Sequence, residues 1–297
     1  MAVDRHELSE AHEVPNDVAT ARVWLERHLA PISDSPQAEA WQLLEALFDL
    51  PKHALINTST TLTSEHKHQL RAWLSRRLQR QPLQYVLGYA HFYGYRFHVT
   101  PAVLVPRPET EVLVYTALDY LKTLPQPPIV IDIGTGSGAI GITIKRECPK
   151  ATVIASDISV EALEVAQYNA QKLATDITFV RGSLLTPPAL QRAAQQADVI
   201  VANLPYLPAD DRVWLSPEVL HEPDSALFAG ADGLSLATTL MQDAFTQLSA
   251  GARLLLELDP RNVERACALA TSKAQTWSQK NVLTDLAGRE RFLLLTR

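Results

Sequence analysis

The sequence predicts an α/β protein in which a helical domain precedes a parallel sheet covered by helices on both faces. Two patterns support this prediction. Apolar residues recur at helical spacing in the first third, and the remainder alternates short strand-like runs with helical stretches. A length of 297 residues favours two domains. We therefore expect a helical domain over residues 1–86, a β-hairpin linker over 87–105 and an α/β domain over 106–297.

Three amphipathic helices are expected in the first domain. Ser35 and Pro36 suit the N-cap and first turn of the second helix, and Thr63 or Ser64 precedes the third. Helices of this kind bury their apolar faces against one another. The residues on these faces are Ala21, Trp24, Leu25, His28 and Leu29 in the first helix, Ala40, Leu43, Leu44 and Leu47 in the second, and Leu70, Trp73, Leu74 and Leu78 in the third.

A basic stretch runs from His66 to Pro108, where the sequence has no Asp or Glu. Two interpretations stay open: a solvated helix face, or a docking surface for an acidic protein or RNA partner. The basic residues are Lys67, Arg71, Arg76, Arg77, Arg80, Arg96 and Arg107.

The α/β part begins after aromatic and β-branched residues from Tyr89 to Val99, which predict the hairpin. Because ligands bind at the carboxyl ends of parallel strands, we expect the functional site at that edge of the sheet. Strands are expected at 129–133, 152–156, 177–180, 198–202, 253–258 and 291–296, with helices at 139–147, 159–173 and 234–249.

Composition narrows the possible settings. The formal charge of -6 argues against a protein that coats nucleic acid. Cys148 and Cys267 lie far apart, so we expect reduced thiols in a cytoplasmic protein. The acidic N-terminus, from Asp4 to Glu13, lacks the order of a signal peptide, and no apolar run approaches the roughly 18 residues of a membrane helix.

A glycine-rich loop from Asp132 to Gly138 directly follows the first predicted strand. Small residues there let the backbone turn sharply and approach a ligand closely. Asp157 ends the next strand, where a carboxylate accepts hydrogen bonds from ribose hydroxyls. The loop and Asp157 therefore predict an adenosine-binding site. The expected cofactor-binding residues are Asp132, Gly134, Thr135, Gly136, Ser137, Gly138, Asp157 and Asn203, with Ser183 and Leu184 near the adenine.

The fourth strand ends at Asn203, Leu204, Pro205 and Tyr206, which supply the groups needed to hold a planar NH₂ group. Asn203 has a side-chain carbonyl, Leu204 a main-chain carbonyl and Tyr206 a flat ring. We expect all four residues to bind substrate, and Asn203, Pro205 and Tyr206 to be catalytic. An amide nitrogen is a poor nucleophile, so alignment with an electrophilic methyl group is the main task, and no metal is expected.

The ordered motifs resemble those of the bacterial release-factor glutamine N5-methyltransferases. The resemblance covers nearly the whole chain. It rests on Pro106-Arg107-Pro108-Glu109-Thr110-Glu111, the Gly134 to Gly138 loop, Asn203 to Tyr206, Glu222-Pro223, Ala226-Leu227 and Asp232-Gly233. The sequence departs from the family pattern at three places. It has Leu204 where the family usually has proline, Gly182-Ser183 where the third strand usually ends in an acid, and Leu258-Asp259-Pro260 where Gly and then Gln often follow.

The resemblance implies a class I, Rossmann-like methyltransferase sheet that uses S-adenosyl-L-methionine. It also implies methylation of the glutamine in the Gly-Gly-Gln tip of peptide chain release factors, with the basic segment from His66 onward as a candidate contact surface. We expect a monomer that binds neither membranes nor, directly, nucleic acid.

Four alternative functions are compatible with parts of the sequence. A glutamine methyltransferase of ribosomal protein L3 shares both main motifs, and an RNA adenine N6-methyltransferase also resembles the chain at Asn203 to Tyr206. A nicotinamide dehydrogenase is suggested by the spacing of Gly136, Gly138 and Gly141, although it leaves Asn203 unexplained. A non-catalytic binding module is the fourth. The form of the Pro106 to Glu111 motif favours the release-factor branch.

Overall fold

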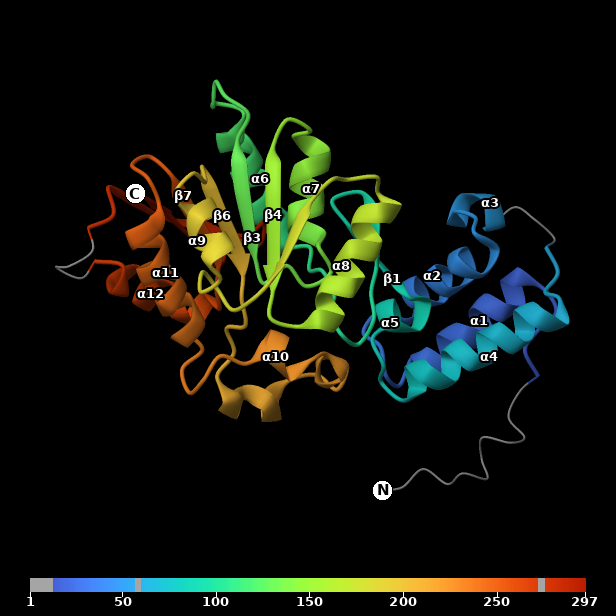
Figure 1. The fold of residues 1–297 in the computed structure, drawn as a ribbon. Helices are drawn as coiled ribbons and strands as arrows, with labels where there is room; N and C mark the ends of the chain where they lie inside the picture. The colour runs from blue at the N-terminus through green and yellow to red at the C-terminus, as the bar shows by residue number, and fades with distance from the viewer. Residues whose placement is uncertain (1–12, 57–59, 272–275) are drawn as a thin grey trace. The chain divides into compact units, whose positions relative to one another are not determined.

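The computed structural model describes residues 13–56, 60–271 and 276–297, and the chain forms two compact units, Met1–Leu87 and Gly88–Arg297 (Figure 1). The expectation about a signal peptide rests largely on residues 1–12, which lie outside the described part. In the described part no helix is long and apolar enough to cross a membrane.

The first unit is a bundle of helices whose caps follow from the sequence. Asp17 accepts a hydrogen bond from the Thr20 amide at 3.0 Å, and Thr63 accepts one from the His66 amide at 3.1 Å. Such caps satisfy amides that have no partner inside the helix. The three expected helices are confirmed, while two short ones were not predicted. The helices are α1 (Val18–Leu29), α2 (Pro36–Phe48), α3 (Lys52–Ile56), α4 (Ser64–Leu78) and α5 (Leu83–Leu87).

Two arginines of the basic stretch point into this bundle. Arg77 is buried, with 2% of its surface exposed; its Nε and Nη2 donate to the Glu39 carboxylate at 2.8 and 3.1 Å, and its Nη1 donates to the Gln81 carbonyl at 2.7 Å. Arg76 donates to the carbonyl of Tyr85 at 2.8 Å. These two side chains therefore join α4 to α2 and α5. The expectation that these residues lie on a docking surface is wrong for Arg77, because its guanidinium is buried and forms an ion pair with Glu39 inside the bundle.

The second unit is built on a seven-stranded sheet with the order β5-β4-β3-β6-β7-β9-β8. The five strands β3 to β7 run parallel, and β9 pairs antiparallel with both β7 and β8. The predicted strands are confirmed to within about two residues, but β8 was not predicted. The strands are β3 (Ile129–Ile133), β4 (Thr152–Asp157), β5 (Thr178–Arg181), β6 (Val199–Asn203), β7 (Arg253–Glu257), β8 (Gln279–Thr284) and β9 (Glu290–Thr296).

Helices cover both faces of this sheet (Figure 1). Side chains alternate along each strand, so Val199 and Val201 of β6 pack on one face while Ile200 and Ala202 pack on the other. α6 (Thr110–Leu121), α7 (Ala139–Glu147) and α8 (Val160–Lys172) cover the first face, and α9 (Pro188–Ala194), α11 (Ser235–Gln247) and α12 (Val263–Leu269) cover the second. Between β6 and α11 the chain forms η1 (Ala209–Trp214), η2 (Val219–His221) and α10 (Asp224–Leu227), and η3 (Pro260–Asn262) precedes α12.

The β-hairpin, made of β1 (Tyr89–Phe92) and β2 (Tyr95–His98), packs within the second unit. Phe92 and Phe97 belong to the same apolar core as α6 and α7. The Tyr93 amide donates to Glu111 Oε1 at 2.7 Å, and the His98 amide donates to Asn169 Oδ1 at 2.7 Å. The hairpin expected as a linker is thus held to α6 and α8.

Arg77 gives the first prediction. Arg77→Ala should lower the free energy of unfolding by about 3 kcal/mol, because it removes a buried guanidinium and leaves Glu39 without that partner. Arg71, on the exposed side of α4, provides a matched control. Arg71→Ala should change the free energy by less than about 0.5 kcal/mol. Urea denaturation of both variants measures the difference, and equal stability of the two would contradict an internal role for Arg77.

Candidate active site

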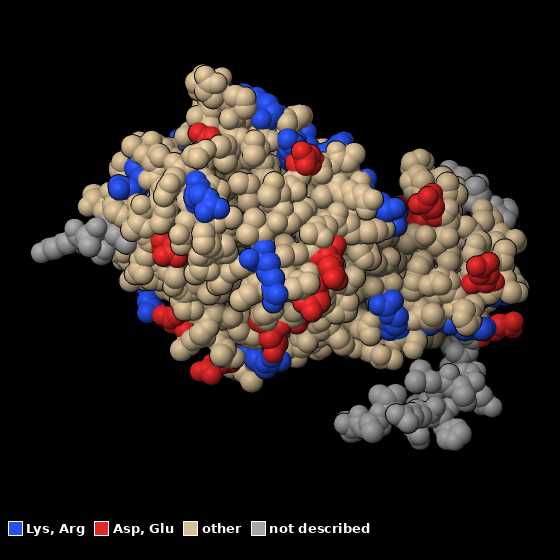
Figure 2. All heavy atoms as spheres, in the orientation of Figure 1, with Lys and Arg blue, Asp and Glu red and all other residues tan. Residues whose placement is uncertain are grey.

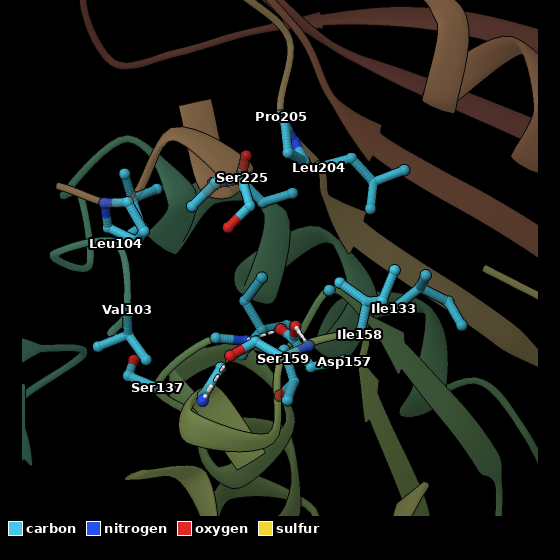
Figure 3. Close-up of a pocket in the computed structure, with 18 of the residues that line it drawn as sticks. Val103, Leu104, Ile133, Ser137, Asp157, Ile158, Ser159, Leu204, Pro205 and Ser225 are labelled. Atoms are coloured by element: carbon cyan, nitrogen blue, oxygen red, sulfur yellow. Dashed lines mark hydrogen bonds between the residues drawn. The ribbon is translucent and has the colours of Figure 1, made fainter. Parts of the chain in front are cut away.

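A cavity lies at the carboxyl ends of β3, β4, β5 and β6. Its walls include Gly134 to Ser137, Asp157, Gly182 to Leu184 and the turn from Asn203 to Pro205. Leu204 and Pro205 lie across the cavity from Ser137 and Asp157 (Figure 3). The volume of about 290 Å³ is near the lower end of the roughly 300–1,000 Å³ found for small-molecule sites. The glycine loop and the Asn203 turn, predicted separately, therefore line one cavity.

Three glycines shape the loop, each for a different reason. Gly134 has φ +72°, and a Cβ there would lie 3.0 Å from Leu204 Cδ2. Gly136 has φ +55° and open space where a Cβ would lie, so its bare backbone faces the cavity. Gly138 has φ +82° at the start of α7, and a Cβ there would meet Ile142 Cδ1 at 2.7 Å. Gly138 packs between helices instead of lining the cavity.

Asp157 lines the cavity and is held by main-chain amides. Its Oδ2 accepts from the Gly136 amide at 2.9 Å, and its Oδ1 accepts from the Ser159 amide at 3.0 Å (Figure 3). A carboxylate has about four acceptor positions. Asp157 can therefore hold the loop and still accept hydrogen bonds from the hydroxyls of a bound sugar.

Asp132 lies behind the loop and does not line the cavity. It is fully buried, and its Oδ2 accepts from Thr135 Oγ1 at 2.6 Å and from the Gly141 amide at 3.0 Å. Burial raises the pKa of its carboxyl to about 6. Asp132 was expected to bind the cofactor, but in the structure its carboxylate joins the glycine loop to α7. Thr135 and Ser137, in contrast, line the cavity.

Ser183 and Leu184, expected near an adenine, also line the cavity after β5. The chain turns sharply there: Leu184 has φ +47°, and a Cβ on Gly182 would lie 2.1 Å from Pro187 Cγ. Gly182 is therefore required by its contact with Pro187. An acid at this position, as the family pattern has it, would need a different turn.

The Asn203 side chain is oriented by α6. Its Nδ2 donates to Thr110 Oγ1 at 3.1 Å, and the residue lines the cavity. Leu204 is buried, and its side chain packs over Gly134. Pro205 lines the cavity directly after it. The turn thus presents one side-chain amide beside the glycine loop.

Tyr206 is not among the described residues that line this cavity. Burial raises the pKa of its phenol, and the nearby Glu257 carboxylate raises it further while Arg291 and Arg107 lower it. Its carbonyl also packs closely on Gly233, where a Cβ would lie 2.1 Å away. The charges of Glu257 and Arg291 therefore act on the Tyr206 phenol. A contact between the ring and a substrate amide stays a prediction.

Several residues that support the site were not predicted. Asn169 of α8 donates to the Ser137 carbonyl at 2.8 Å and to the His98 carbonyl at 2.9 Å, so it ties the glycine loop to the hairpin. Arg107 forms an ion pair with Glu222, which also accepts from the Val105 amide at 3.1 Å. The sequence offered one indication of a role for Asn169, which is a polar residue on the otherwise apolar face of its helix.

The surface and the metal-binding potential add two observations. Figure 2 shows basic and acidic side chains interspersed over the visible face, without a continuous basic strip among the residues drawn in colour. Within residues 13–56, 60–271 and 276–297, no group of three or more His, Cys, Asp or Glu side chains could hold a metal ion.

Comparisons with known proteins agree with this geometry. Residues 20–88 match the family model described as PrmC N-terminal domain, and residues 116–230 match the model described as Methyltransferase small domain. The chain is also similar, at a TM-score of 0.54 and 13% identity, to the solved hMettl16 catalytic domain in complex with an RNA hairpin, over 80% of this chain and 84% of that one. At this identity the likeness concerns the fold alone.

Two relatives cover nearly the full length. A protein of Deinococcus radiodurans named release factor glutamine methyltransferase is 41% identical, over 89% of this chain and 92% of its own length. A protein of Neisseria gonorrhoeae with the same name is 37% identical, over 89% of this chain and 94% of its own. With both domains matched in order, the chain belongs to the release factor glutamine methyltransferase family.

Proposed function

We propose that this protein transfers a methyl group from S-adenosyl-L-methionine to the side-chain amide nitrogen, N5, of the glutamine in the Gly-Gly-Gln motif of peptide chain release factors. One observation carries the proposal: the glycine loop and the Asn203 turn line the same cavity. The names of the two full-length relatives support the same substrate. The proposal includes a monomer, because every group that the reaction needs comes from one chain. It also includes a cytoplasmic location and no direct binding of nucleic acid.

The cavity fits S-adenosylmethionine by the chemistry of its walls. Gly136 presents backbone without a Cβ, and Asp157 presents a carboxylate with spare acceptor positions. Ser183 and Leu184 offer a partly apolar wall after β5 for a base. When bound, this cofactor supplies an electrophilic methyl group on a sulfonium. The residues that would hold it are Gly134, Thr135, Gly136, Ser137, Asp157, Ser183 and Leu184.

The Asn203 turn provides acceptors for a substrate amide. A glutamine NH₂ group has two protons, and Asn203 Oδ1 and the Leu204 carbonyl are two acceptors on adjacent residues. Binding both protons fixes the nitrogen in place and stabilises the positive charge that it gains when it forms the new bond to carbon. The bond from that carbon to the sulfonium sulfur would break in the same step, and its electron pair would stay on sulfur as a neutral thioether. The nitrogen then loses one proton, which solvent accepts, because an alkylated amide nitrogen is strongly acidic.

The alternatives fit less well. Hydride transfer by a dinucleotide dehydrogenase does not require two acceptors for an NH₂ group, such as those at Asn203 and Leu204. Ribosomal protein L3 would present the same glutamine amide, so a direct comparison of the two protein substrates separates it from a release factor. An adenine amine is also a planar NH₂ group, yet the two full-length relatives carry the release-factor name.

Asn203 gives the central test. With labelled S-adenosylmethionine and a purified release factor, mass spectrometry should find the methyl group on the tip glutamine. Asn203→Ala should lower the turnover rate by roughly 10²- to 10³-fold, the range for removal of one stabilising hydrogen-bond group. Calorimetry should find cofactor affinity little changed. A variant with full activity, or label on another residue, would contradict the assigned role.

Asp157 gives a complementary test on the cofactor side. Asp157→Ala should weaken S-adenosylmethionine binding by roughly 10-fold or more, because hydrogen bonds to a charged group contribute about 1.5–3 kcal/mol. Asp176, an exposed acid that follows α8, is the control. Asp176→Ala should bind the cofactor like the unchanged protein. Calorimetric titration of both variants measures this, and equal affinities would remove Asp157 from the cofactor site.

A further inference from the structure

The side chain of Asn203 is the first member of a buried hydrogen-bonded chain. Asn203 and Glu257 are register partners on the adjacent parallel strands β6 and β7, so both side chains point to the face covered by α6. Thr110, in the first turn of α6, lies between them. Its Oγ1 accepts from Asn203 Nδ2 at 3.1 Å, and its hydroxyl lies close enough to the Glu257 carboxylate to lower the pKa of that carboxyl by hydrogen bonding. Thr110 is 3% exposed and Glu257 2%.

The chemistry of Thr110 determines which group donates and which group accepts in this series of hydrogen bonds. A hydroxyl has a single proton, and an ionised carboxylate only accepts hydrogen bonds. When Thr110 donates its proton to Glu257, it presents lone pairs to Asn203. Asn203 must then turn its NH₂ group toward Thr110, which leaves Oδ1 as the atom available to the cavity.

We propose that Thr110 and Glu257 are positioning residues that hold the Asn203 amide in the one orientation able to accept a proton from the substrate amide. This inference rests on the proposed function. In the opposite orientation Asn203 would present an NH₂ group to the NH₂ group of the substrate, and two donors cannot bond to each other. Without the hydroxyl, nothing in the chain of contacts selects between the two orientations.

The position of Thr110 gives a physical reason for a threonine in the Pro106 to Glu111 motif. Glu111 binds the Tyr93 amide and Arg107 binds Glu222, so neighbouring motif residues hold the segment at the start of α6. Thr110 is the motif residue whose side chain reaches Asn203. Thr110 also lines the cavity, and its hydrogen bond to Asn203 connects the motif to the residue assigned to the substrate amide.

Glu257 also makes the chain sensitive to pH. The charged and titratable groups that face it are Arg291 of β9, Glu109 and Arg107 next to α6, and Tyr206 after β6. Its Oε2 has no hydrogen-bond partner among the described residues, and burial raises the pKa of the carboxyl to about 7. A protonated Glu257 can donate to Thr110, which frees the Thr110 proton to turn toward Asn203 Oδ1. Turnover should therefore fall as pH decreases through about 7.

Two variants of Thr110 test the inference on the full chain with a purified release factor. Thr110→Ser keeps the hydroxyl and should stay within about threefold of the unchanged protein. Thr110→Val keeps the shape but lacks the hydroxyl, and should lower kcat by about 10- to 100-fold, as loss of orientation does. Cofactor affinity and the KM for release factor should change little. Equal activity of the two variants, whether high or low, would overturn the positioning role.

A second measurement decides the matter if Thr110→Val does not fold. Glu257→Gln should give a lowered kcat that no longer varies between pH 6 and 8, because glutamine bonds to Thr110 in either orientation. Glu290, an exposed acid of β9, is the control, and Glu290→Gln should keep the pH profile of the unchanged protein. An acid limb that persists in Glu257→Gln would overturn the inference. Absence of methyl transfer by the unchanged protein would instead overturn the proposed function, and this inference with it.

Discussion

The register between the parallel strands is the constraint on which the site depends. Ile133 of β3 is level with Ser156 of β4 and with Ala202 of β6. The residues that follow are Gly134, Asp157 and Asn203, so the three groups proposed to act together emerge side by side at one edge of the sheet. A slip of one residue would turn each side chain to the opposite face. The buried side chains of β6 and β7 oppose such a slip, because each is packed against the helical layer that it faces and would have to repack on the other side.

Much of this arrangement followed from the sequence because it depends on local patterns. Apolar runs marked β3, β4, β6 and β7, and glycines marked the loop. The structure differs where a prediction ignored the direction of a side chain. Asp132 was expected at the cofactor, yet it lies two residues after Val130 and so faces α7, like Val130. Strand β8, Gln279–Thr284, was not predicted because it is an edge strand with no fully buried residue and little apolar periodicity.

Side-chain direction also explains the outcome for the basic stretch, part of which forms helix α4. Composition indicated a positive surface, but Arg77 follows Leu70 and Leu74 at a spacing of seven and three residues, which places all three on one helix face. Leu70 and Leu74 are core residues of the bundle, so their face is the buried one. Helical periodicity therefore already placed Arg77 inside, where Glu39 neutralises it. The number of charged residues in a segment does not say in which direction each side chain points. That direction decides whether a charged group contacts a partner protein or a neighbouring helix.

Leu204 shows how a departure from the family pattern can be absorbed. Its side chain packs over Gly134 on the buried side of the turn, while the carbonyl is the group assigned to the substrate. A proline at this position would rigidify the main chain through its ring. Here Leu204 is held instead by contacts, since it is 7% exposed and belongs to the apolar core beneath the loop. Because the assigned chemistry uses only the main-chain carbonyl of residue 204, packing of the side chain can replace the ring. The same contact makes Gly134 intolerant of a side chain, so the cofactor loop and the substrate turn constrain each other directly.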